Sequence, residues 1–227
     1  MLDFTLLGSI AVIHAIALAS PGPDFAIMLK VSRYQTRAVA MMTALGIAAA
    51  ILAHTLASLT GLSLLIHTTP WLFGAVQALG AAYLGYMGLG ALISVRKQFL
   101  LRRELPLSSQ STPTDAPPNP DSMLSTAKGF RLGLYTNLLN PKALVFFLTL
   151  FSAMVGPEVN SATRMALLVL MFALSFAWFG LLAVLLTKNS SQRALVRLGP
   201  IIDLVTGVLF LMVSVAILFG LATEYVG

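Results

Sequence analysis

Residues 38–95 read AVAMMTALGIAAAILAHTLASLTGLSLLIHTTPWLFGAVQALGAAYLGYMGLGALISV, without one Asp, Glu, Lys or Arg. A membrane-spanning helix needs about 20 consecutive apolar residues, so this stretch is long enough for two of them. The polar segment HTTP at 67–70 separates the two, and its Pro70 is well tolerated in the first turn of a helix. The stretch therefore predicts two membrane helices joined by a tight hairpin.

The rest of the chain has the same character. Of its 227 residues, 58% are hydrophobic and only 10% are charged, and the mean hydropathy is +0.90. Soluble domains carry about 25% charged residues, so this composition excludes an ordinary soluble globular protein. The sequence contains no cysteine, which excludes disulfides, thiolate metal sites and thiol redox chemistry. We predict an all-α, polytopic membrane protein that holds no metal and no other cofactor.

Apolar segments between the charged residues predict six transmembrane helices, at 6–29, 38–66, 71–93, 132–155, 165–187 and 200–222. With six spans, the connections after the first, third and fifth helices share one face of the membrane. These connections and their flanks hold every Lys and Arg except Lys142 and Arg164. By the positive-inside rule that face is cytoplasmic, and both termini lie outside. Topology thus accounts for the basic residues, so nucleic acid is not an expected partner.

Residues 94–128 are rich in Pro, Ser and Thr and predict a flexible cytoplasmic linker. This linker divides the chain into a first three-helix repeat at 1–93 and a second at 129–227. Pro23-Asp24 corresponds to Pro141-Lys142, and GAAYL at 80–84 resembles GVLFL at 207–211. Apolar helices also resemble one another by chance, but the paired prolines favour a repeat. Because each half has an odd number of spans, the repeats would be inverted, which is typical of transporters.

Two proline motifs interrupt apolar segments, SPGPD at 20–24 and NPK at 140–142. Proline removes a backbone donor and clashes with the preceding turn, while Gly22 permits unusual dihedral angles, so we expect the first and fourth helices to be broken here. Carbonyl groups freed at this depth need protein, water or ligand partners, because lipid offers none. Asn140 and Pro141 favour the start of a new half-helix, whose N-terminus suits a carboxylate.

An acid and a base follow the two breaks, Asp24 and Lys142. An ionisable side chain inside a membrane costs about 3 kcal/mol on insertion scales, so we expect neither charge to be isolated. One interpretation is an ion pair that locks the first helix to the fourth. The other, which we favour, is that Lys142 attracts a substrate carboxylate while Asp24 receives an ammonium group or a proton. Both hold if the ion pair is the resting state of the site.

Other polar residues complete the predicted site. Asn137, one turn before Asn140, either lines the same cavity or bonds to a neighbouring helix. His54 is a candidate proton relay, although a neutral histidine bonded across helices is more common. Asp203, near the expected start of the last helix, is explained by the helix dipole. The predicted substrate-binding residues are Pro21, Gly22, Pro23, Asp24, Asn137, Asn140, Pro141 and Lys142, and the predicted proton-coupling residues are Asp24 and His54.

In this order on a six-span chain, these motifs resemble the LysE/RhtB family of bacterial amino-acid exporters. The resemblance rests on ASPGPDF at 19–25, GIAA at 46–49, GAAYL at 80–84 and NLLNPKA at 137–143. It implies proton-driven export of amino acids or small derivatives across the bacterial inner membrane, with both proline motifs in the transport site. The segment TLFSAM at 149–154 and the long linker depart from the family pattern, which leaves the substrate open.

The predicted function is secondary active export of a small zwitterionic substrate, as antiport with protons and by alternating access. Export of another small metabolite or ion, and a non-catalytic scaffold for other membrane proteins, remain alternatives. Signatures of an intramembrane enzyme such as HExxH or GxSG are absent from the sequence, so no enzyme is expected. The expected partners are the substrate, protons and the lipid bilayer, and faces of small residues are compatible with a homodimer.

Overall fold

The computed structural model describes residues 1–104, 123–186 and 189–226, and every regular element within these ranges is a helix. The helices are α1 (Phe4–Ala19), α2 (Pro23–Tyr34), α3 (Arg37–Thr68), α4 (Pro70–Glu104), α5 (Thr126–Leu138), α6 (Pro141–Met154), α7 (Ser161–Leu185) and α8 (Asn189–Val226). The prediction of an all-α protein is confirmed for this part of the chain. Most of the expected linker, 105–122, lies outside the described residues.

Four helices, α3, α4, α7 and α8, are each long and apolar enough to cross a membrane. The pair α1 and α2 passes the same test with a 57° bend between them, and the pair α5 and α6 passes it with a 58° bend. By length and composition the described residues thus offer four spans, or up to six if each bent pair is one span. The predicted breaks in the first and fourth apolar segments are confirmed.

The two breaks share one local design. α1 ends at Ala19, and Pro23 opens α2 at a position where its missing N–H has no intrahelical partner. Asn140 caps α6 by accepting a hydrogen bond from the Lys142 backbone N–H at 3.0 Å, which confirms the half-helix expected there. Gly22 has φ −178°, an extended conformation open to any residue. The expectation that Gly22 supplies an unusual dihedral angle is therefore wrong.

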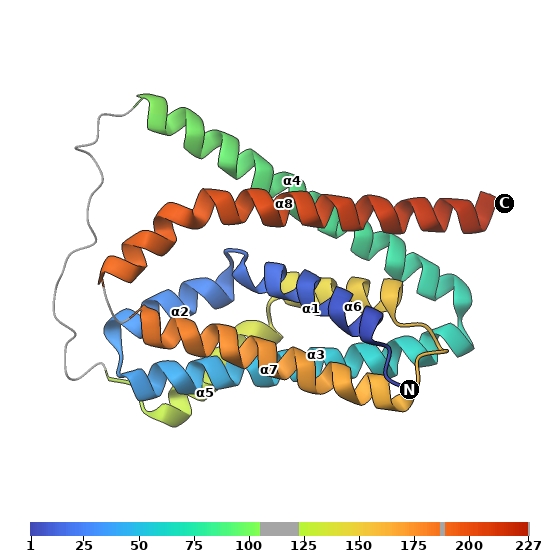
Figure 1. Cartoon of the computed structure of the whole chain (residues 1–227), viewed down its shortest axis with the longest axis horizontal. Coiled ribbons are helices and arrows are strands. Elements are labelled where there is room, and N and C mark those ends of the chain that lie inside the picture. The colour runs from blue at the N-terminus through green and yellow to red at the C-terminus, as the bar shows by residue number, and fades with distance from the viewer. Residues whose placement is uncertain (105–122, 187–188, 227) are drawn as a thin grey trace.

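Figure 1 shows how the broken helices are enclosed. α4 and α8 cross on one side of the molecule, and α1 and α6 lie between them and the layer that contains α3, α5 and α7. The N- and C-termini lie at the same end as the α3–α4 and α6–α7 connections, while the α2–α3 connection lies at the opposite end. Each break lies between these layers, where Asn140 is buried while Pro21 and Leu139 remain exposed.

Glycine permits two close helix crossings. On α5, a Cβ added to Gly129 would lie 2.8 Å from the Val39 carbonyl oxygen of α3, so the two backbones touch. On α4 and α8, a Cβ on Gly88 would lie 2.8 Å from the Gly207 carbonyl oxygen, and one on Gly207 would lie 2.9 Å from that of Gly88. Small residues at such crossings are the usual means of bringing membrane helices together.

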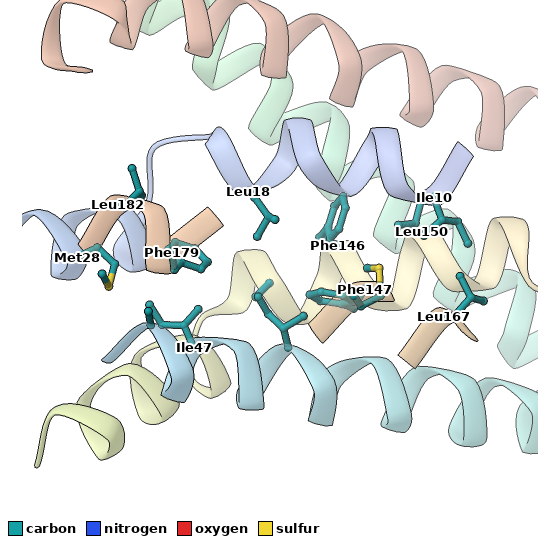
Figure 2. Packing of buried hydrophobic residues seen from close by; sticks show 14 of the residues in the cluster. Ile10, Leu18, Met28, Ile47, Phe146, Phe147, Leu150, Leu167, Phe179 and Leu182 are labelled. Carbon is teal, nitrogen blue, oxygen red and sulfur yellow. The ribbon is translucent and has the colours of Figure 1, made fainter. Parts of the chain in front are cut away.

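The apolar core fills the space between the layers. Figure 2 shows Leu18 of α1 beside Phe146 and Phe147 of α6, with Ile47 of α3 and Phe179 of α7 facing them. The rings of Phe146 and Phe147 meet edge to face with centroids 5.4 Å apart, a favoured aromatic geometry. This packing holds α6, and with it the second break, against α1 and α3.

Two helices run further than their apolar segments predicted. α4 continues to Glu104, so residues 94–104 of the expected linker are helical. α8 begins at Asn189 and contains Pro200 in its interior, rather than starting at Pro200. Asp203 consequently lies several turns inside α8, and its explanation as a residue that stabilises the helix start is wrong. Hydropathy marks where lipid can cover a helix, whereas backbone hydrogen bonding decides where the helix ends.

Candidate functional site

The two helix breaks meet at Asp24. Asn137, in the last turn of α5, and Asn140, the cap of α6, each donate a side-chain N–H to Asp24 Oδ2, at 3.0 and 3.1 Å. Asp24 Oδ1 and Asn137 Oδ1 are buried and have no hydrogen-bond partner among the described residues. A buried carboxylate oxygen without a donor is costly, so this side of Asp24 is suited to an incoming cation or proton.

Lys142, in the first turn of α6, reaches back to the other break. Its Nζ donates to Ser20 Oγ and, at 3.2 Å, to the Pro21 carbonyl oxygen. The helix break frees this carbonyl from the α-helical ladder, and the lysine now satisfies it. Nζ also lies 5.8 Å from the centroid of the Phe210 ring of α8, within cation–π range.

In the part of the chain that the structure describes, Asp24 and Lys142 do not form a direct ion pair. Each charge has partners of its own, the two amides for Asp24 and Ser20 with Pro21 for Lys142. The interpretation of a locking ion pair therefore does not describe this conformation. The arrangement leaves an anionic and a cationic group side by side, each able to take a further ligand.

A cavity of about 50 Å³, here called the central cavity, lies between the breaks. Its polar lining comes from both breaks and from one histidine: His14, Ser20, Asp24, Asn137, Asn140 and Lys142. Its aromatic lining consists of Phe25, Phe146, Phe147, Phe179 and Phe210. Since one water needs about 10–15 Å³ by this measure, the cavity has room for a few waters. It is a small chamber with charged groups from the breaks and apolar walls.

The structure divides the predicted site residues into two groups. Gly22, Asp24, Asn137, Asn140 and Lys142 line the central cavity. Pro21, Pro23 and Pro141 do not line it; they shape the breaks that carry the lining side chains.

Of the two buried histidines, one lines the central cavity and the other does not. His54 donates from Nε2 to the Asn137 carbonyl oxygen at 3.2 Å, and its ring stacks on Phe147. These contacts hold the last turn of α5 in place. His14, which was not among the predicted site residues, lines the cavity, and its Nε2 shares a 2.9 Å hydrogen bond with Ser175 Oγ of α7. Both histidines interrupt apolar helices, so the sequence offered no signal that separates the cavity-lining one.

The aromatic walls were also missed, although they had a recognisable position. Phe146 follows Lys142 by one helical turn and therefore shares its face of α6. Among the described residues, no group of three or more His, Cys, Asp or Glu side chains could hold a metal ion.

Comparison with known proteins agrees with these features. The family model of the LysE type translocator matches residues 15–221. The threonine efflux protein of Escherichia coli (strain K12) is 32% identical over 202 residues, 89% of this chain and 92% of that protein. The threonine efflux protein of Salmonella typhi is 33% identical over 92% of this chain and 94% of its own length. An uncharacterized membrane protein of Haemophilus influenzae is 26% identical over 96% of this chain.

No solved structure matches the chain. The membrane-protein relatives and the long apolar helices show a multi-pass membrane protein. A transport protein rather than an enzyme was predicted, and the family match confirms this. With a family model that covers nearly the whole sequence, and with relatives above 30% identity over most of both chains, this chain belongs to the LysE type translocator family.

Proposed function

We propose that this protein exports a small zwitterionic amino acid, of the size of threonine, from the cytoplasm by antiport with protons. The observation that carries the proposal is the pairing of Asp24, with one oxygen held and the other without a partner, and Lys142 around one cavity. An amino acid carries the complementary ammonium and carboxylate groups. Two relatives that match most of this chain are named threonine efflux proteins.

The substrate would bind across the two breaks. Its carboxylate faces Lys142 and the N-terminal end of α6, where the helix dipole adds partial positive charge. Its ammonium faces Asp24 Oδ1, while Asn137 and Asn140 hold the other oxygen of that carboxylate. Discontinuous helices that present their ends to substrate are a common transporter design.

A six-span topology accounts for the arrangement of the helices. A bend of 57° or 58° leaves the two parts of each broken helix running in broadly the same direction, as one span requires. Both termini lie at one end of the molecule, and the α2–α3 connection, flanked by basic residues, lies at the other. By the positive-inside rule the basic end faces the cytoplasm, across the bacterial inner membrane.

Two inverted repeats would supply the transport movement. The matching bends of 57° and 58° and the reciprocal contact of Gly88 with Gly207 support a repeat of α1–α4 in α5–α8. The central cavity has room for only a few waters, so the halves must part before an amino acid such as threonine can bind. Rocking of one half against the other would expose the site to each side of the membrane in turn.

Proton coupling would occur at Asp24. If this carboxylate binds either the substrate ammonium or a proton, each transport cycle exchanges one for the other. His54 is the second candidate, since it contacts the backbone of Asn137 beside Asp24. Coupling at Asp24 and coupling at His54 predict different effects of substituting these residues.

Lipid would cover the outer faces of α4 and α8. Large apolar side chains are exposed there, among them Leu79 and Tyr86 of α4 and Val215 and Phe219 of α8. The same faces would support a homodimer, and crosslinking in intact membranes distinguishes the dimer from a lipid-covered monomer.

Counterflow of radiolabelled amino acids in proteoliposomes, with and without a proton gradient, tests the function. We expect saturable threonine flux that the gradient accelerates, and its loss in Asp24→Asn and Lys142→Ala proteins that insert normally. Arg131→Ala and Glu158→Gln are charge-matched controls, because both side chains are exposed and neither lines the central cavity.

The possible results separate the site from the function. Wild-type flux that both site variants preserve would refute the site but not the function. Folded wild-type protein that moves no amino acid would favour another small metabolite or a scaffold.

A further inference from the structure

A second cavity, of about 210 Å³, lies beside the central one. It is lined by Ser20, Pro21, Met87, Ala91, Lys142, Asp203, Thr206 and Phe210, from the α1–α2 break, α4, α6 and α8. We call it the Asp203 cavity. Lys142, Ser20 and Phe210 line both cavities, so these three residues form the partition between them. The second cavity has several times the space of the first.

The Asp203 carboxylate requires an explanation of its own. It lies in the segment of α8 that is apolar enough to span the membrane, several turns after the helix begins. A carboxylate at such a place is rare and is usually functional. Lys142 lines the central cavity together with Asp24 and the Asp203 cavity together with Asp203. One cation is therefore flanked by two acids, one in each cavity.

The Asp203 cavity lies toward the end of the molecule opposite to the termini. Met87 lies at the middle of α4 and Ala91 in its later half, and Asp203 lies in the earlier half of α8. Both halves are near the end of the molecule opposite to the termini. Among the described residues, α6 packs against α4, whereas its counterpart α2 makes at most a marginal contact with α8. The Asp203 cavity therefore lies toward α2 and α8, which contact each other less than α6 and α4 do.

We propose that the Asp203 cavity is an access site, where the amino acid binds from the cytoplasm with its ammonium on Asp203 and its carboxylate on Lys142 before it moves to Asp24. This proposal rests on the proposed function. Because Lys142 serves both cavities, the substrate keeps its carboxylate partner while its ammonium exchanges one acid for the other. Asp203 is the one carboxylate among the described residues that line this cavity, and it supplies the anionic charge there.

Transport kinetics measured separately on the two membrane faces test the access site. In vesicles of known orientation, Asp203→Asn should raise the KM for threonine at least tenfold on the face of the basic loops, because a charge-assisted contact is lost. The maximal rate on the basic face, and the KM on the opposite face, should stay within twofold of wild type. Glu158→Gln is the matched control, a neutralised carboxylate outside both cavities.

A substrate analogue separates direct contact from a structural role. The 2-hydroxy acid that corresponds to threonine lacks the ammonium, so its inhibition constant on the basic face should be the same in wild type and Asp203→Asn. An equal change for both compounds, or an equal change of KM on both faces, would overturn the access site. Asp203→Ser provides a second neutral variant, and failure of both variants to insert would show a structural role instead. Absence of any wild-type flux refutes the proposed function itself, and the access site with it.

Discussion

Asn140 combines two interactions that one substitution removes. Its Oδ1 caps α6 at 3.0 Å from the Lys142 N–H, and its Nδ2 donates to Asp24 at 3.1 Å. Loss of an N-cap costs about 1 kcal/mol, and loss of a hydrogen bond to a charged group costs about 1.5–3 kcal/mol. We therefore expect Asn140→Ala to lower the free energy of unfolding by about 2.5–4 kcal/mol.

Two matched variants separate these contributions. Asn140→Ser keeps an oxygen that can cap the helix but loses the amide donor. Asn137→Ala removes the other amide donor to Asp24 and no side-chain cap, since Asn137 lies in the last turn of α5. Each should cost about 1.5–3 kcal/mol, roughly 1 kcal/mol less than Asn140→Ala. Reversible unfolding in mixed micelles, with a denaturing detergent as titrant, measures these differences.

The ranking decides whether the site is held as described. If Asn140→Ser is as unstable as Asn140→Ala, the cap contributes nothing and the half-helix has another origin. If Asn137→Ala is neutral, its hydrogen bond to Asp24 does not hold the carboxylate. The first result would refute the capping role of Asn140, and the second would refute the view that the two amides jointly fix Asp24 Oδ2.

Two further predictions concern the helix crossing and the coupling residue. Gly88→Ala should destabilise the protein by about 1–3 kcal/mol, because its Cβ would lie 2.8 Å from the Gly207 carbonyl oxygen, whereas Gly90→Ala, with nothing within 4 Å, should be neutral in the same unfolding assay. His54→Gln should keep gradient-accelerated flux in proteoliposomes, because His54 does not line the cavity, whereas Asp24→Asn should lose it. Loss of acceleration in His54→Gln with normal downhill flux would assign the coupling to the histidine instead.

The breaks were predictable because proline acts locally. Pro23 and Pro141 each lack an N–H and favour the first turn of a helix, so their positions alone indicate where α2 and α6 begin. Asn140 was recognisable as a cap because it immediately precedes Pro141 and because asparagine is a preferred N-cap residue. An intramembrane charge needs partners, so a partner for Asp24 was also expected, but the one named was Lys142, whereas the structure places Asn137 and Asn140 on this carboxylate.

The features that the sequence did not predict depend on tertiary packing, which leaves no signal in the local sequence. Asp203 was misinterpreted because α8 was expected to start at Pro200, whereas the helix begins at Asn189 and passes through the proline. His54, and not His14, was among the predicted site residues, yet the packing of α1 against α7 and α6 places His14 at the cavity. Phe210 reaches the site from α8, and the sequence alone does not show which face of that helix turns inward.

The origin of the cavity lining has an evolutionary consequence. The groups that match a zwitterion come from the two helix breaks, whereas the walls come largely from phenylalanines on regular helices. Under the proposed function, substitution of a wall residue such as Phe146 or Phe179 would alter the space for a side chain and leave the recognition of the α-amino and α-carboxyl groups in place. Descendants of one ancestral gene can therefore diverge among amino acids of different size while they retain both proline motifs unchanged.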